Sequence, residues 1–83
     1  MILPKLLRKK TLEALKMAEG YGKHEDMLRE MVEELTGEDP GRQAMRDALE
    51  PLHADDLIRS EKDEDKVVLW YITPKGSAKL NTL

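Results

Sequence analysis

Two histidines and a short acidic run are the residues whose types could do chemistry. His24 and His53 stand far apart in the sequence, and a metal ion would need both of them plus a carboxylate. We expect them to be ordinary residues near a helix start and a helix end. The run Asp63–Asp65 lacks the spaced ligands and the glycine of a calcium-binding loop, so we expect a solvated turn. Cysteine is absent, which excludes disulfides and thiolate metal sites.

No catalytic arrangement is visible elsewhere. The chain has no glycine-rich phosphate loop, and no serine lies near a histidine in a recognisable motif. A length of 83 residues predicts one domain, residues 1–83, with a small core and little room for a catalytic cleft. We therefore expect no enzyme activity, no metal and no cofactor. The first residues contain no apolar run long enough for a signal peptide or a membrane span, so we expect a cytoplasmic protein without membrane contact.

The charges are unevenly distributed, although the net charge is only −3. Residues 1–16 carry five bases and one acid, residues 17–65 carry six bases and sixteen acids, and residues 66–83 carry three lysines and no acid. Both termini are therefore basic and the middle is acidic. The cluster Arg8-Lys9-Lys10 begins a predicted helix, where basic residues oppose the helix dipole. It is either a solvated face or a patch that meets phosphate or a partner.

Apolar residues at helical spacing predict three helices, over residues 5–19, 23–36 and about 40–53. Gly20 and Gly37 are expected to end the first two, because glycine adopts the left-handed conformation at little steric cost. The residues expected in the core are Leu6, Leu7, Thr11, Leu12, Ala14, Leu15, Ala18, Met27, Leu28, Met31, Val32, Leu35, Met45, Ala48, Leu49 and Leu52. The outer face of the second helix is acidic and carries Glu25, Asp26, Glu30, Glu33 and Glu34.

The third helix has a clear start signal and an uncertain end. Asp39 is the expected N-cap and Pro40 the expected first helical residue. Pro51 removes a helical hydrogen bond and pushes Glu50 out of helical geometry. The third helix therefore either kinks between Asp47 and Pro51 or ends by Glu50.

Residues 56–76 predict a hairpin followed by a short helix. The expected strands are residues 57–60 and 66–72, joined by a longer, mobile loop, because residues 61–66 contain neither glycine nor asparagine. Thr73 and Pro74 give an N-cap and a first residue for a helix over 74–82, with Ala78 and Leu80 facing inward.

Both faces of the second strand are apolar. Val68, Trp70 and Ile72 share one face, and Val67, Leu69 and Tyr71 share the other. One face is expected to cover the core. The other is covered either by a dimer partner or by the terminal segments.

The predicted elements follow the order helix, helix, helix, strand, strand, helix. Leu57-Ile58 comes after the third helix, and Tyr71-Ile-Thr-Pro-Lys-Gly76 comes after the second strand. This order and these residues resemble the winged helix-turn-helix superfamily. The chain also resembles small winged-helix proteins of Mu-like prophages. The resemblance spans roughly residues 5–82. It implies an α+β winged helix with three helices, a two-stranded wing and a short C-terminal helix.

The resemblance also implies a function, a DNA-binding transcriptional regulator of bacterial or prophage type that acts as a dimer. Its third helix would enter the major groove, where Arg42, Gln43 and Arg46 would read bases. The phosphate contacts would come from Arg8, Lys9, Lys10, the C-terminal lysines and, on the wing, Lys62. The alternative is a winged-helix module that binds protein through the acidic second helix, the acidic wing or the apolar strand face, without DNA.

Overall fold

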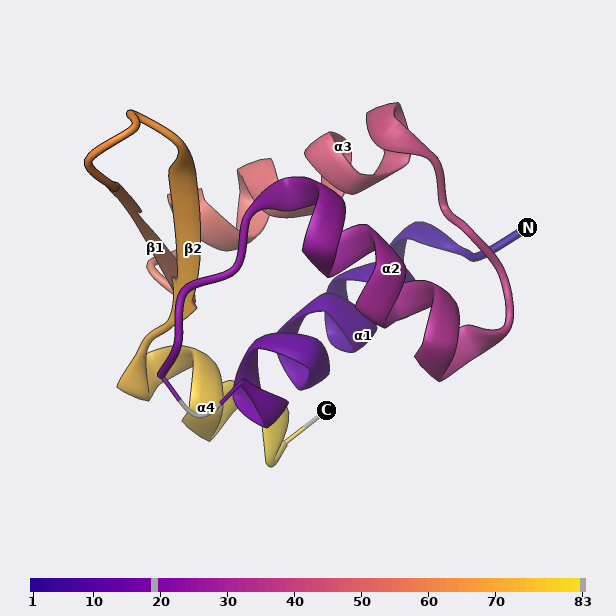
Figure 1. The fold of residues 1–83 in the computed structure, drawn as a ribbon. Coiled ribbons are helices and arrows are strands. Elements are labelled where there is room, and N and C mark those ends of the chain that lie inside the picture. The colour runs from indigo at the N-terminus through magenta and orange to yellow at the C-terminus, as the bar shows by residue number, and fades with distance from the viewer. Residues whose placement is uncertain (19, 83) are drawn as a thin grey trace.

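The computed structural model describes residues 1–18 and 20–82 (Figure 1). Three helices, α1 (Pro4–Met17), α2 (Glu25–Thr36) and α3 (Arg42–Ala54), pack around a common core. Strands β1 (Ile58–Lys62) and β2 (Val68–Ile72) follow, and helix α4 (Pro74–Leu80) comes last. This is the predicted order of elements. The predicted end of the first helix at residue 19 lies outside the described residues, and the last helical residue of α1 is Met17.

Helix α1 lies at the centre of the core, in contact with α2, α3, α4 and β2. Its one fully buried polar side chain, Thr11, donates a hydrogen bond to the carbonyl oxygen of Leu7 at 2.8 Å, so that the hydroxyl is satisfied. Leu6 and Met27 were predicted to be buried, but they are 43% and 37% exposed. Each lies at the edge of its apolar stripe, near the start of its helix. The buried apolar residues are Leu7, Leu12, Ala14, Leu15, Ala18, Leu28, Val32, Met45, Ala48, Leu49, Leu52, Leu57 and Ile58.

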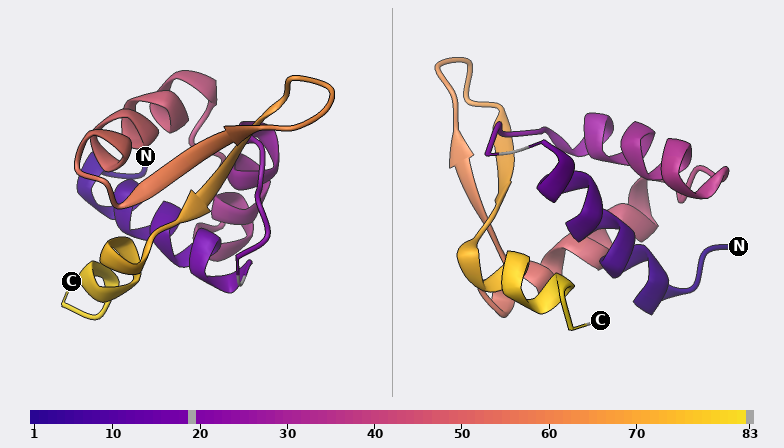
Figure 2. Two further views of the ribbon diagram at one scale, coloured as in Figure 1. Left: turned by 90° about the vertical axis from the view of Figure 1, so that its left-hand side faces the viewer. Right: turned by 90° about the horizontal axis from the view of Figure 1, so that it is seen from below.

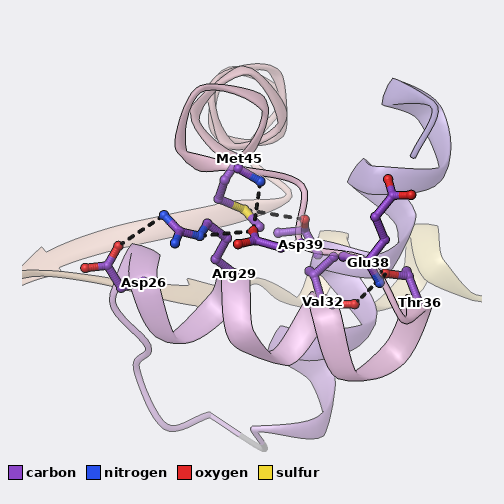
Figure 3. Close-up of polar contacts among 9 residues, drawn as sticks. Asp26, Arg29, Val32, Thr36, Glu38, Asp39 and Met45 are labelled. Atoms are coloured by element: carbon purple, nitrogen blue, oxygen red, sulfur yellow. Dashed lines mark hydrogen bonds and ion pairs between the residues drawn. The ribbon is translucent and has the colours of Figure 1, made fainter. Parts of the chain in front are cut away.

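The turn between α2 and α3 is held by side chains (Figure 3). Arg29 Nε lies 3.2 Å from Asp39 Oδ1, and the same oxygen accepts a hydrogen bond from the Gly41 N–H at 2.9 Å. Thr36 Oγ1 donates to the carbonyl oxygen of Val32 at 2.8 Å. The prediction that Asp39 caps α3 is wrong, because the N-cap is Gly41, whose φ of 86° turns the chain into the helix. Asp39 instead fixes the turn just before the cap.

Helix α3 continues through Pro51 to Ala54, so of the two alternatives that the sequence left open, the end by Glu50 is excluded. Proline cannot donate the hydrogen bond that the Asp47 carbonyl would otherwise accept. Leu49 and Leu52 are each only 3% exposed, and their burial keeps this part of the chain helical despite the lost bond.

Strands β1 and β2 form an antiparallel hairpin that projects beyond the helices (Figure 2). Ile58 pairs with Ile72, and Lys62 pairs with Val68. Strand β1 therefore continues past Ser60, where the sequence predicted its end, and β2 begins after Lys66.

Residues 63–67 join the strands, so the connection is longer than a two-residue turn, as the sequence predicted. The Asp63 carboxylate accepts hydrogen bonds from the N–H groups of Asp65 at 2.8 Å and Val67 at 2.9 Å. The Asp63 carbonyl accepts another from the Lys66 N–H at 3.0 Å. Lys66 has a φ of 62°, the left-handed conformation that glycine or asparagine usually supplies. An aspartate side chain and a left-handed lysine thus replace the glycine or asparagine that is common in hairpin turns.

The connection between α1 and α2 adds a short bridge to the free edge of β2. Lys23 and Trp70 exchange two backbone hydrogen bonds, of 3.0 and 2.8 Å. A Cβ on Gly22 would lie 2.5 Å from Tyr71 Cζ and 2.9 Å from Leu69 Cβ. The α1–α2 connection therefore covers part of the second face of β2. On the first face Trp70 packs against the core, as predicted.

The final helix begins as predicted, since the Thr73 hydroxyl accepts a hydrogen bond from the Gly76 N–H at 3.0 Å. Leu80 packs against the core, also as predicted. Ala78 is exposed, contrary to the prediction, because Gly76 occupies the buried position of this helix.

Candidate nucleic-acid interface

The outer face of α3 carries the residues that the sequence selected as base readers. Arg42 and Gln43 are exposed in the first turn, and the Arg46 side chain, one turn later, is 64% exposed. The N-cap Gly41 has no side chain that could cover the first N–H groups of the helix. In Figure 1 and in the left view of Figure 2, α3 and the hairpin tip lie toward the top and α4 lies at the bottom. The geometry thus gives α3 an open face at the end of the molecule from which the hairpin projects.

Two of these side chains already have acidic partners. Gln43 Nε2 donates to Asp47 Oδ1 at 2.9 Å, within the same helix face. Arg46 Nε lies 3.4 Å from Glu25 Oε1, which comes from the first turn of α2. The Glu25 side chain is 25% exposed. The sequence analysis missed this partner, because nothing in the sequence shows that the start of α2 lies beside the middle of α3.

The basic cluster of α1 is divided between two faces of its helix. Arg8 lines a hollow with Ala44, Asp47 and Ala48 of α3. Lys9 lines a different hollow, which includes Thr82. Lys10 Nζ forms an ion pair with Glu13 at 3.0 Å. The structure therefore brings Arg8 close to α3, and it places Lys9 on the side that faces the C-terminal residues.

The hairpin carries both basic and acidic side chains. Lys62 is exposed at the end of β1, and Lys66, which the sequence analysis did not select, is exposed in the turn. The acids Glu61, Asp63, Glu64 and Asp65 surround them. Of these, Glu61 pairs with Arg59 and the Asp63 carboxylate is occupied by the turn. Glu64 and Asp65 remain as exposed charges at the tip.

Both histidines make contacts that support the fold. His24 is the N-cap of α2, where its Nδ1 accepts a hydrogen bond from the Met27 N–H at 3.2 Å. His53 lies in the last turn of α3, with its ring edge-to-face against Trp70 at a centroid distance of 5.4 Å. Within residues 1–18 and 20–82, no three His, Asp or Glu side chains gather in a way that could hold a metal ion.

Known structures resemble this arrangement closely. A MarR-family transcriptional regulator from Silicibacter pomeroyi superposes with a TM-score of 0.73 at 26% identity, over 92% of this chain and 47% of its own. A proposed transcriptional regulator from Thermoplasma acidophilum gives 0.79 at 20% identity, over 95% and 75%. A winged-helix DNA-binding protein from STIV gives 0.79 at 16% identity, over 99% and 86%. The chain has a winged-helix fold.

The winged helix spans about half the length of the MarR-family chain. No protein-family model matches the sequence, and no curated protein matches it either. The resemblance to proteins of Mu-like prophages stays a prediction. Among the described residues, no helix is long and apolar enough to cross a membrane.

Proposed function

We propose that this winged helix is a DNA-binding transcriptional regulator of bacterial or prophage type that acts in the cytoplasm. The observation that carries the proposal is the exposed row Arg42, Gln43 and Arg46 on α3. It lies on a fold shared with a winged-helix DNA-binding protein from STIV. We propose no enzymatic role and no cofactor.

In this proposal α3 enters the major groove with its N-terminal half. Arginine donates two hydrogen bonds to guanine, and glutamine forms a matched pair with adenine, so these side chains discriminate bases. Lys62 on the hairpin and Arg8 beside α3 would contact phosphates, which position the protein without reading sequence. Lys9 and Lys10 would contribute only if the DNA also reached the other side of α1.

Binding would require the readers to leave their acidic partners. Arg46 is bound by Glu25 and Gln43 by Asp47 in the free protein. The exposed Gln43–Asp47 hydrogen bond contributes only about 0.5–1.5 kcal/mol, which a well-formed base contact outweighs. The Arg46–Glu25 pair is partly buried, so its loss offsets more of the base contact. The acids still repel phosphate, so we expect a narrow contact with few phosphates and therefore a small slope of the binding constant against salt concentration.

Fluorescence anisotropy of a labelled mixed-sequence duplex tests whether DNA is bound at all. We expect saturable binding at low salt that weakens as salt rises. A selected high-affinity duplex then tests the reader, since Arg46→Ala should weaken binding to it by about 1–3 kcal/mol. Lys16→Ala, which removes a charge near Ser77 of α4, is the matched control and should leave the affinity unchanged.

The absence of binding at low salt would overturn the proposal and favour the protein-interaction module. Equal affinities for Arg46→Ala and Lys16→Ala would keep DNA binding but remove α3 as its reader.

The predicted homodimer through Val67, Leu69 and Tyr71 belongs to this proposal as well. Val67 is 41% exposed, whereas Leu69 and Tyr71 are partly covered, so the open part of that face is its end near the hairpin turn.

A further inference from the structure

A groove lies between α3 and β2, and the chain leaves it open. Its volume is about 380 Å³, within the size range of small-molecule sites. Leu49, Trp70 and Val68 form its apolar part, and His53 packs its ring edge-to-face against Trp70. Arg46, Glu50 and Glu25 supply its charges.

One acceptor in this groove lacks a donor. Glu25 Oε1 is buried and accepts no hydrogen bond from any described residue. The nearby Arg46 Nε, at 3.4 Å, forms an ion pair with it but not a well-aligned hydrogen bond. A buried carboxylate oxygen without a donor is unfavourable. A bound group that brings an N–H donor to this oxygen would remove that cost.

The charges and the aromatic ring select one kind of ligand. Two carboxylates, Glu25 and Glu50, face one guanidinium, so the groove is net acidic and disfavours phosphates and carboxylates. Trp70 is the chain's only tryptophan, and indole is the best aromatic partner for a cation. An apolar ligand body would contact Leu49, while its cationic head would reach Glu25.

We propose that this groove binds a small organic cation, an aromatic or aliphatic body with an amidinium or ammonium head that donates to Glu25 Oε1. The head would replace Arg46 as the partner of Glu25 and complete the hydrogen bonding that the chain leaves unmade. The site shares Arg46 with the proposed function, but the binding of a cation to Glu25 does not require that α3 binds DNA.

Titration of the full chain with benzamidine, followed by ¹H–¹⁵N NMR, tests the site. Saturable shifts are expected at the Trp70 indole N–H and at the amides of Glu25 and Leu49, with a dissociation constant on the order of 1 mM or below. Benzamide has the same shape without the charge and should bind at least about tenfold more weakly, because it cannot form the ion pair with Glu25. Benzoate should not bind.

Two variants keep the test decisive. Glu25→Gln should weaken benzamidine binding at least about fivefold, since it removes the charged acceptor. Glu33→Gln neutralises an exposed acid elsewhere on α2 and should change nothing. The proposal is overturned by the absence of shifts at 10-fold the expected dissociation constant (about 10 mM), by equal binding of benzamide, or by an unchanged affinity in a folded Glu25→Gln variant.

Discussion

Gly76 is the residue at which helix propensity and packing oppose each other most sharply. It lies in the first turn of α4, where alanine would favour the helix by about 1 kcal/mol. A Cβ there would collide with the backbone carbonyl oxygen of Leu57, which cannot move without shifting the start of β1. We expect Gly76→Ala to destabilise the protein by about 2–3 kcal/mol and to lower Tm by about 10–20 °C, as measured by thermal denaturation.

Lys75→Ala is the control for that prediction, because Lys75 is exposed in the same helical turn. Its effect should stay within about 0.5 kcal/mol. A Gly76→Ala variant as stable as this control would show that the Leu57 backbone moves away from α4 at little cost, which would contradict the predicted clash.

Single residues were predictable from the sequence where their role is local. Thr73 caps its own helix, and Gly37 ends its own helix with a φ of 79°, so neighbouring residues carried the whole signal. The ion pair of Glu25 with Arg46 was not predictable, because it joins two helices whose relative position depends on the folded core. Asp39 shows an intermediate case, since its carboxylate does accept a backbone N–H but in the turn before the helix.

The hairpin contains a strained element that one substitution can relieve. Lys66 has a φ of 62°, which costs a residue with a Cβ about 1–2 kcal/mol. We expect Lys66→Gly to stabilise the protein by about 0.5–1 kcal/mol after the entropy that glycine loses on folding. Urea denaturation measures the change. Lys62→Gly, in the regular part of β1, should destabilise instead, and stabilisation by both variants would refute the role of the turn conformation.

The acidic hairpin tip is an element-scale obstacle to the proposed DNA contact. Glu64 and Asp65 are exposed there, whereas Asp63 must be kept because its carboxylate closes the turn. We expect Glu64→Gln with Asp65→Asn to strengthen binding to a mixed-sequence duplex about threefold to tenfold at low salt, by removing repulsion from phosphates.

The anisotropy titration of that variant needs a control variant that changes the net charge by the same amount. Glu33→Gln with Glu34→Gln removes two exposed charges from α2 and should have a much smaller effect. Equal gains in the two variants would mean that overall charge, and not the hairpin, limits affinity.

At the same scale, the order of elements was predictable, but several element boundaries were not. Hydrophobic periodicity and caps are local signals, so they placed every helix and strand to within a few residues of its position. Pro51 stays inside α3 because burial of Leu49 and Leu52 outweighs one lost hydrogen bond, and that burial is a tertiary effect. The connection between the strands is longer than two residues, as predicted, but its hydrogen bonds to the Asp63 carboxylate and its left-handed lysine gave no signal in the sequence.

The whole molecule separates its charges in space as well as in sequence. α3 and the hairpin carry the proposed contact, whereas α2 carries exposed acids and the α1 cluster is split between two sides. The basic residues near the proposed face are Arg8, Arg42, Arg46 and Lys62. Lys9 lies toward Thr82, and Lys10 is paired with Glu13. The number of phosphates that the protein neutralises therefore distinguishes the narrow contact from one that also uses Lys9 and Lys10.

The slope of log binding constant against log salt concentration counts those phosphates. Each neutralised phosphate of duplex DNA adds about −0.9 to the slope, so the two phosphate contacts of Arg8 and Lys62 predict a slope of about −2. The addition of Lys9 and Lys10 would make four contacts and predicts about −4. We expect the smaller value, and we expect Lys9→Ala with Lys10→Ala to leave it unchanged, because Lys9 lies toward Thr82 and Lys10 is paired with Glu13. A slope near −4 that falls in this double variant would mean that DNA wraps past α3 onto α1, and the interface would then have to include both faces of that helix.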